Sequence, residues 1–286
     1  MKEIIIHIGR HKTGTTSLQH FLALNDNILV NQCNLLYPES GRDQRLLNHH
    51  PIFRDVVVDD GEINMKLVKS ILLEAEDKGV SRILLSSEIL SRRTVTASQL
   101  IRIRDAFKDC QISIVVYLRR QDKFLQSAYA ERVKRGFVAS PDTIHDIDAA
   151  LNYYKFIDKY ADVYPPNTIT VKSFEAAVKA NLYSDFLSIF NINLSSDFQI
   201  PKKSSNERWP WLYIETIRYA NSMKSVRKIL THHWIVGAAI KLNQMLPHML
   251  DNPKPLSVED SRRIMKKYYE SNKAVAQKYL NKDELF

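Results

Sequence analysis

The residues best suited to bind an anion lie near the N-terminus. Gly9 and Gly14 enclose the sequence Arg-His-Lys-Thr, and Thr-Thr-Ser follows Gly14. The largely apolar residues 4–8 come directly before them. This pattern predicts a buried strand, a tight loop and the first turn of a helix, so that several backbone N–H groups and the helix N-terminus point at one anion. Lys12 is the only lysine in this loop, which we interpret as a phosphate-binding loop.

The position of Lys12 separates this loop from the Walker sequence of nucleoside triphosphatases. That sequence, G-x-x-x-x-G-K-[ST], places the lysine directly before Ser or Thr. Gly9 and Gly14 have the required spacing, but Thr15 stands where the lysine should be, and Lys12 comes two residues before Gly14. This displacement indicates a phosphorylated nucleotide other than a nucleoside triphosphate. A degenerate triphosphatase loop and an ordinary strand–turn–helix stay open as alternatives.

A second pair of anion-binding residues follows another apolar run. Residues 112–118 predict a strand buried on both faces, and Arg119 comes directly after it. A helical pattern over about 121–135 places Ser127 roughly two turns into the next helix. An arginine fork suits a phosphate dianion, and a hydroxyl adds a short hydrogen bond. Arg119 and Ser127 can therefore face one pocket beside the first loop.

Together the two segments resemble the sulfotransferases that use 3′-phosphoadenosine 5′-phosphosulfate (PAPS). Residues 12–16, Lys-Thr-Gly-Thr-Thr, are similar to the K-x-G-T-T loop that binds the 5′-phosphosulfate in that family. The R-x(7)-S spacing of Arg119 and Ser127, continued by Ala-Tyr, is similar to the family's 3′-phosphate site. The Arg-Gln after Arg119 departs from the family's frequent Asp/Asn-Pro. The resemblance covers residues 3–172.

The resemblance implies transfer of a sulfuryl group from PAPS to a hydroxyl or amine, leaving 3′-phosphoadenosine 5′-phosphate (PAP), with no metal ion. Lys12 would stabilise the bridging oxygen as that atom takes up negative charge. Lys203 belongs to a polar basic segment that could replace the family's late basic loop, and a plain surface loop is an equal alternative. The residues expected to bind the nucleotide are Arg10, Thr13, Gly14, Thr15, Thr16, Ser17, Arg119, Ser127 and Lys203.

The sequence leaves open which residue accepts the proton of the acceptor. Glu88 is the first candidate because it follows a predicted strand, although a buried acid paired with an arginine such as Arg92 explains it equally well. His49 and His50 come next, since imidazole titrates near pH 7. Glu39 is third: several carbohydrate sulfotransferases keep a catalytic glutamate at a comparable distance after the lysine, in a different local motif.

Two functions of other classes stay open. A nucleotide or small-molecule kinase, or an NTPase, would use ATP and Mg²⁺ and needs an acidic residue at the end of a second strand. Glu88 could supply that acid, whereas residues 112–118 are followed by two arginines instead. A PAP- or anion-binding protein that kept the pocket and lost the base is the non-enzymatic alternative.

Composition favours anionic ligands. Among 286 residues, 41 are Lys or Arg and 32 are Asp or Glu, so the formal net charge is +9. This charge suits PAPS, an acidic polysaccharide or an anionic membrane surface. The basic residues are dispersed and no nucleic-acid motif occurs, so nucleic acid is not expected. Two cysteines are too few for a disulfide framework or a zinc site.

The residues around the loop and the length of the apolar runs indicate the acceptor class and the cellular compartment. The loop lacks the Tyr-Pro before the lysine and the Trp after Gly-Thr-Thr that mark sulfotransferases of small phenols. The resemblance therefore favours a carbohydrate, a polysaccharide precursor or a glycolipid as acceptor. No run approaches the ~18 apolar residues of a membrane span, and the first strand begins too early for a signal peptide. We expect a cytoplasmic protein that can associate peripherally with membranes.

The remaining pattern predicts an α/β fold. Expected strands at 82–87, 112–118 and 168–172 alternate with helices, which implies a P-loop-like, three-layer fold with a central parallel sheet between helices. Ligands of such sheets bind at the carboxyl ends of the strands, where both motifs lie. The expected helices begin near residue 18 and then span about 63–76, 97–108, 121–135 and 148–161.

The domain organisation follows from where this alternation stops. The chain is mostly helical from about residue 179. We therefore expect a nucleotide-binding core over 1–178 and a helical extension over 179–286 packed on it. Residues 26–60 are expected to be irregular because they contain Pro38, Gly41 and Pro51, and 137–147 to form a loop that can serve as a lid.

Overall fold

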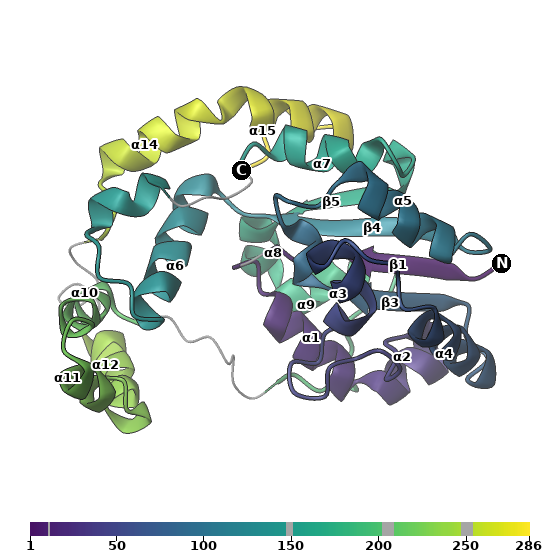
Figure 1. Ribbon diagram of the computed structural model, residues 1–286, viewed down its shortest axis with the longest axis horizontal. Helices are drawn as coiled ribbons and strands as arrows, with labels where there is room; N and C mark the ends of the chain where they lie inside the picture. The colour runs from purple at the N-terminus through teal and green to yellow at the C-terminus, as the bar shows by residue number, and fades with distance from the viewer. Residues whose placement is uncertain (11, 147–150, 202–208, 247–253) are drawn as a thin grey trace. The chain divides into compact units, whose positions relative to one another are not determined.

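The computed structural model describes every residue except 11, 147–150, 202–208 and 247–253 (Figure 1). The chain forms two compact units. The first contains residues 1–119, 149–203 and 269–286, and the second contains residues 120–148 and 204–268. The boundary expected between residues 178 and 179 lies inside helix α8 (Phe174–Ala180), within the first unit.

A five-stranded parallel sheet runs through the first unit in the order β2-β3-β1-β4-β5 (Figure 1). The expected parallel α/β fold is therefore confirmed, and the two-residue strand β2 is an addition to it. The strands are β1 Glu3–His7, β2 Leu35–Leu36, β3 Arg82–Ser86, β4 Gln111–Leu118 and β5 Ile169–Ser173.

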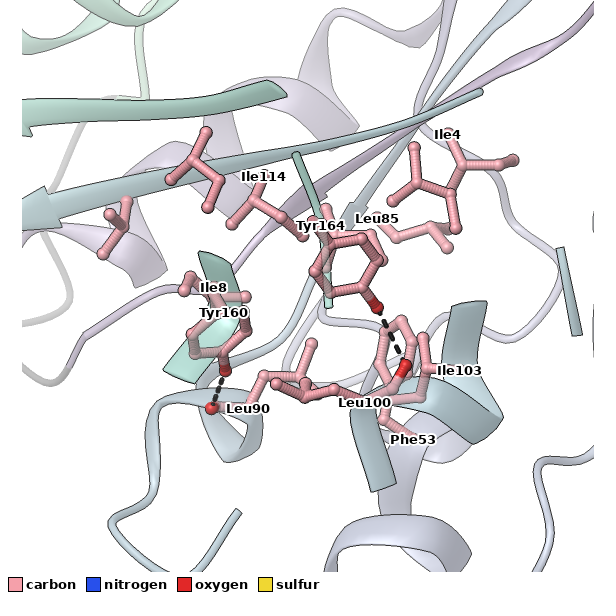
Figure 2. Close-up of a cluster of buried hydrophobic side chains, with 14 of the residues drawn as sticks. Ile4, Ile8, Phe53, Leu85, Leu90, Leu100, Ile103, Ile114, Tyr160 and Tyr164 are labelled. Atoms are coloured by element: carbon pink, nitrogen blue, oxygen red, sulfur yellow. Dashed lines mark hydrogen bonds between the residues drawn. The ribbon is translucent and has the colours of Figure 1, made fainter. Parts of the chain in front are cut away.

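The apolar strands are covered on both faces, as a parallel sheet requires. Because side chains alternate along a strand, Ile4 and Ile6 of β1 lie in one buried cluster and Ile5 lies in another. Figure 2 shows the first cluster, in which the hydroxyl of Tyr164 donates a hydrogen bond to the carbonyl of Leu100 at 3.1 Å. This bond satisfies a polar group that would otherwise be buried alone.

Helices form the two outer layers of the first unit. The cluster that contains Ile4 takes side chains from α3, α4, α5 and α7, and the cluster that contains Ile5 takes them from α1, α2, α8 and α9. The bounds are α1 Thr15–Leu24, α2 Asp26–Cys33, α3 His50–Val58, α4 Met65–Asp77, α5 Ala97–Ala106, α7 Tyr153–Ala161, α9 Leu182–Ser188 and α15 Tyr269–Val275.

The expectation that residues 26–60 are irregular is wrong. They contain α2 and α3, and Pro51 stands in the first turn of α3 rather than ending a helix. Proline is accepted there because its missing N–H would have no partner within the helix and its φ already suits one. Helix α3 then buries Ile52, Phe53 and Val56, which stabilises it through packing rather than through propensity.

The second unit is built from helices, and it takes in residues 120–148 of the expected core while leaving 179–203 and 269–286 in the first unit. Its helices are α6 Gln121–Lys134, α10 Trp211–Ala220, α11 Lys224–Leu230, α12 His233–Met245 and α14 Val258–Lys267. The Tyr129 hydroxyl of α6 donates to Glu215 Oε1 of α10 at 3.0 Å, which joins these two helices. The loop expected at 137–147 contains a 3₁₀ helix, Pro141–Asp146. No helix in the described part of the chain is long and apolar enough to cross a membrane.

Candidate functional site

The first loop lies at the point where the sheet order reverses. The chain leaves β1 towards β2 on one side, and β4 continues to β5 on the other, so the crevice between β1 and β4 is the expected ligand site. The Ile8 N–H donates to the Val115 carbonyl at 3.0 Å and extends this pairing beyond β1. The loop of residues 9–14 therefore begins directly at the carboxyl edge of the sheet.

At both loop glycines, neighbouring atoms leave no room for a larger side chain. Gly14 has φ 71° and caps α1, and a Cβ there would lie 2.6 Å from Leu182 Cδ2. A Cβ on Gly9 would lie 2.4 Å from Thr15 Cγ2. Lys12 also has a positive φ, 68°, so the loop turns twice through the left-handed region. The loop conformation thus depends on Gly9 and Gly14, the two glycines that define the sequence pattern.

Threonine hydroxyls hold the loop from inside. The buried hydroxyls of Thr13 and Thr15 both donate to the Arg10 carbonyl, at 2.7 and 3.3 Å. These contacts give the Thr15 hydroxyl a role within the loop, and nucleotide binding by Thr15 stays a prediction. The first bond within α1 runs from Leu18 N–H to Gly14 O at 3.0 Å, so the N–H groups ahead of it are directed out of the helix end.

Thr16 and Ser17 occupy the half-buried first turn of α1. Their backbone N–H groups belong to the positive end of the helix dipole, where an anion is stabilised. Helix α1 contains ten residues, and no acidic residue stands in its first turn. The helix terminus is therefore suited to the phosphate that the sequence predicts.

Arg10 packs into the core beside the loop. Its side chain is buried, and its guanidinium carbon lies 5.0 Å from the ring centre of Tyr153 and 4.8 Å from that of Phe156. Burial lowers the pKa of Arg10. The contacts are cation–π interactions with α7, so the structure gives the Arg10 side chain a packing role, and nucleotide binding by it stays a prediction.

Arg119 lies beside the loop, and nucleotide binding by it stays a prediction. It follows β4, and its Nη1 donates to the Lys12 carbonyl at 2.8 Å. Its guanidinium carbon lies 5.3 Å from the Phe174 ring centre, and its Nε lies 3.9 Å from Glu175 Oε1. The arginine of the second motif therefore meets the lysine of the first on one edge of the sheet.

Tyr153 supports both arginines and was not identified from the sequence. Its ring lies against Arg10, and its hydroxyl donates to the Arg119 carbonyl. Burial raises the pKa of Tyr153 to about 12, so the hydroxyl stays protonated and remains a donor at neutral pH. No motif distinguishes this tyrosine from the other aromatic residues of α7.

The remaining nucleotide-binding candidates lie elsewhere. Ser127 lies in the second turn of α6, in the second unit, and is half-buried. Lys203 falls outside the described residues. Arg120, which stands where the resembled family often has Asp or Asn, donates from Nε and Nη2 to the buried carboxylate of Asp122 at 3.1 and 3.2 Å.

His49 is a structural residue. Its Nδ1 accepts the Ser86 N–H at 3.2 Å, so its Nε2 must carry the proton, which it donates to the Pro38 carbonyl at 3.0 Å. Complete burial lowers the pKa of His49 to about 3. These contacts argue against His49, one of the candidates, as the base.

His50 and Glu88 stay candidates for that base. The His50 Nδ1 lies 2.9 Å from the Ser87 hydroxyl, and both His50 and Glu88 are half-buried. The Ser87 N–H donates to the His7 carbonyl at 3.0 Å, which ties the end of β3 to the end of β1. Glu88, the next residue, therefore begins beside the strand that carries the loop.

A buried polar network joins these strand ends. The Ser86 hydroxyl lies 3.0 Å from His7 Nδ1 and accepts Gln19 Nε2 at 3.1 Å. Burial lowers the pKa of His7 to about 4, and the nearby Glu88 carboxylate opposes this shift. The sequence signal for this network is the Ser-Ser pair that ends the apolar run of β3.

Glu39 is the most exposed of the acidic candidates. Its carboxylate lies 3.7 Å from Arg42 Nη2, and its backbone N–H donates to Glu74 Oε1 at 3.0 Å. The Arg42 guanidinium is shared with Asp26, 3.2 Å away. Nothing in these contacts singles out Glu39 as a base.

The second unit contains a pocket of about 420 Å³ between α6 and α14. Lys123, Lys254 and Arg262 line it, and none of them has a carboxylate partner among the described residues. Gln126 also lines it, with 6% of its surface exposed and no hydrogen-bond partner for its carboxamide in the described part of the chain. The pocket is therefore suited to a polar, negatively charged ligand.

No family model and no curated protein matches the sequence. Solved structures similar to this chain include a sulfotransferase from Alicyclobacillus acidocaldarius, with 17% identity and a TM-score of 0.42 over 81% of this chain and 96% of that chain. The sulfotransferase domain from the curacin biosynthetic pathway has 13% identity and a TM-score of 0.40, over 94% and 98%. Retinol dehydratase, in complex with androsterone and inactive cofactor PAP, has 11% identity and a TM-score of 0.37, over 97% and 82%. Similarity of this degree assigns neither an activity nor a ligand to this chain.

Proposed function

We propose that this protein is a PAPS-dependent sulfotransferase. The observation that carries this proposal is the 2.8 Å hydrogen bond from Arg119 Nη1 to the Lys12 carbonyl. It joins a glycine-bounded anion loop to an arginine more than a hundred residues away, at the edge where a parallel sheet binds ligands. One nucleotide with phosphates at both its 5′ and 3′ positions would use both groups.

The loop supplies the features that sulfuryl transfer needs. The N-terminus of α1 binds the 5′-phosphate through backbone N–H groups. Lys12, at the tip of the loop, stabilises the bridging oxygen as the bond to sulfur breaks and that oxygen takes up negative charge. Arg119 pairs with the 3′-phosphate as a planar fork. A sulfuryl group carries less charge than a phosphoryl group, so this chemistry does not require a metal ion.

Glu88 is our proposed base. Its backbone follows β3 directly and is tied to β1 through the Ser87 N–H, so it belongs to the same sheet edge as the loop. In the transfer, a carboxylate accepts the proton of the acceptor hydroxyl while that oxygen attacks sulfur in line. His50, bonded to the Ser87 hydroxyl, is the second choice.

We further infer that the acceptor is an anionic carbohydrate or glycolipid. The loop lacks the flanking residues typical of small-phenol sulfotransferases. The pocket of the second unit offers Lys123, Lys254 and Arg262 to acidic groups and the Gln126 carboxamide to hydroxyls. Arg262→Ala should raise KM for an acidic acceptor and leave kcat nearly unchanged, because the arginine would bind substrate without touching the reacting atoms.

The first experiment is isothermal titration with PAP and with ADP, each with and without Mg²⁺. We expect PAP to bind without metal and ADP to bind more weakly. Arg119→Ala should weaken PAP binding by about tenfold or more, because a charged hydrogen bond to phosphate is lost. Arg104→Ala, which removes an exposed arginine on α5, is the matched control and should change nothing.

Turnover distinguishes an enzyme from a binding protein. With radiolabelled PAPS and a panel of neutral and acidic glycans, Lys12→Ala should lower kcat by about 10²- to 10³-fold and change PAP affinity much less. Lys66→Ala, at an exposed position of α4, is the control. Preference for ADP with Mg²⁺ would support a kinase or NTPase instead. PAP binding that Lys12→Ala weakens, with no turnover in the wild type on any acceptor, would support a binding protein.

A further inference from the structure

One segment of the second unit has an unusual charge pattern. Residues 216–250 contain no Asp or Glu. The basic residues in the same span are Arg218, Lys224, Arg227, Lys228 and Lys241. Elsewhere acidic and basic residues are interspersed, so a uniformly positive segment of this length distinguishes one part of the surface from the rest.

Helix α12 in this segment is apolar and poorly covered. None of its thirteen residues, all of which the structure describes, is buried. Trp234, Ala238, Lys241 and Met245 are spaced at helical intervals and form one exposed stripe, with Leu242 beside it. Trp234 is 63% exposed and Met245 is 78% exposed. The stripe thus presents large apolar side chains to solvent around a single lysine.

Helix α11 adds to this exposed apolar surface. It contacts α12 and lies beside it in Figure 1. Ile229 is 62% exposed and Val226 is 39% exposed, and Met223, directly before the helix, is 54% exposed. Large exposed apolar side chains gathered on two contacting helices are typical of an interaction site. We call α11 and α12, residues 224–245, the basic apolar hairpin.

The charge of the hairpin decides between two kinds of partner. In a symmetric dimer the same patch meets itself, so Lys228 and Lys241 of both copies would meet like charges. An anionic bilayer offers opposite charge to the lysines and an apolar interior to Trp234 and Met245. Tryptophan favours the bilayer interface, and a lysine beside apolar residues can extend its ammonium to the headgroups.

The length of α12 fixes how it would lie. Thirteen residues are too few to cross a bilayer, which takes about 20. A short helix with one apolar stripe and neighbouring basic residues lies instead in the plane of the interface.

We propose that the basic apolar hairpin docks on the surface of an anionic phospholipid bilayer. The exposed stripe of α12 enters the headgroup region, and Lys228 and Lys241 attract the anionic lipids. This inference does not rest on the proposed sulfuryl transfer, because it concerns lipid binding by a separate surface.

The test is co-sedimentation of the full chain with vesicles of phosphatidylcholine, with and without phosphatidylglycerol. We expect binding only to the anionic vesicles, and its loss at high salt. The pair Trp234→Ser and Met245→Ser should weaken binding by about tenfold or more. The pair Leu73→Ser and Val178→Ser, exposed apolar positions of the first unit, is the control and should leave binding unchanged.

The charge contribution is tested separately. Lys228→Gln with Lys241→Gln should weaken binding by about tenfold or more, and Lys66→Gln with Lys69→Gln, two exposed lysines of α4, should have little effect. The fluorescence of the wild type should shift to the blue on anionic vesicles. The Trp234→Phe variant should lose this shift while keeping most of its binding.

Three results would overturn the proposal. Equal binding to neutral and anionic vesicles would remove the role of charge. Equal loss in the hairpin and control variants would remove the role of the hairpin. A concentration-dependent dimer, measured by light scattering and abolished by the hairpin substitutions, with no vesicle binding, would identify a second copy of the chain as the partner.

Discussion

Arg119 contributes both its side chain and its backbone to the candidate site. Its Nη1 donates to Lys12 O, and its own carbonyl accepts the hydroxyl of Tyr153, whose ring lies against Arg10. These bonds fix the guanidinium in place before any ligand binds. A side chain that is already ordered loses less entropy when it binds a phosphate.

Two buried histidines near this site make the stability of the fold depend on pH. Burial lowers the pKa of His49 to about 3 and that of His7 to about 4, so both are neutral in the folded protein. In the unfolded chain each takes up a proton below about pH 6.5. The stabilisation is therefore complete above that pH and is lost as the pH falls from about 6.5 towards the folded-state values.

We expect the free energy of unfolding to fall by about 2 kcal/mol for each of these histidines between pH 6.5 and pH 5. Urea denaturation across this range measures it. His49→Gln should lower stability at pH 7 but flatten the pH dependence, because one of the two groups no longer titrates. His20→Gln, at a half-buried position of α1, is the control and should keep the wild-type slope. An unchanged slope in His49→Gln would contradict this account.

At the scale of the elements, the loop between β1 and α1 depends on neighbours distant in sequence. The space at Gly14 is closed by Leu182 of α9 and by Phe174 at the start of α8. The hydroxyls of Thr13 and Thr15 are turned inward to the Arg10 carbonyl. The loop is thus held by its own hydrogen bonds and by helices that follow the sheet.

Gly14→Ala should destabilise the protein and weaken PAP binding. Two effects add: the alanine must adopt φ 71°, and its Cβ would lie 2.6 Å from Leu182 Cδ2. Gly79→Ala separates them, because Gly79 has φ 65° and no atom within 4 Å of the added Cβ. We expect a loss of about 1 kcal/mol for Gly79→Ala and clearly more for Gly14→Ala. Equal losses, or unchanged PAP binding in Gly14→Ala, would show that the contact with Leu182 does not shape the loop.

At the scale of the whole molecule, neither compact unit is one continuous piece of chain. The chain passes between the units after residues 119, 148, 203 and 268. The last residues return to the first unit, where Val275, Ala276 and Leu285 are buried in the same cluster as Ile4 of β1. A fragment of residues 1–178 would therefore lack part of the core that covers the sheet.

Val275→Ala tests this return of the C-terminus. Val275 is fully buried, so its truncation should lower the free energy of unfolding by about 2 kcal/mol. Val178→Ala is the same substitution at a position that is 54% exposed, and it should cost less than about 0.5 kcal/mol. Chemical denaturation of both variants measures the difference, and equal effects would mean that the C-terminal residues contribute little to this core.

The sequence by itself determined the sheet and the loop. The strands β1, β3 and β4 could be predicted because a strand covered on both faces is an almost unbroken apolar run, a property of neighbouring residues. The edge strand β5 shows a different local pattern, since its apolar residues Ile169 and Val171 alternate with polar ones. The glycine spacing and the displaced Lys12 are equally local. The two-residue β2 has too short a pattern to recognise, and α3 was missed because Pro51 ends some helices and begins others.

Only the tertiary structure decided what each polar residue does. The residues 49 and 50 are both histidines, but one is buried with both ring nitrogens bonded and the other is half-buried beside Ser87. Thr15 and Thr16 are also identical in type, and only the first turns its hydroxyl inward. Burial and hydrogen-bond partners depend on residues brought close by folding from distant parts of the chain, so no local pattern distinguishes such neighbours.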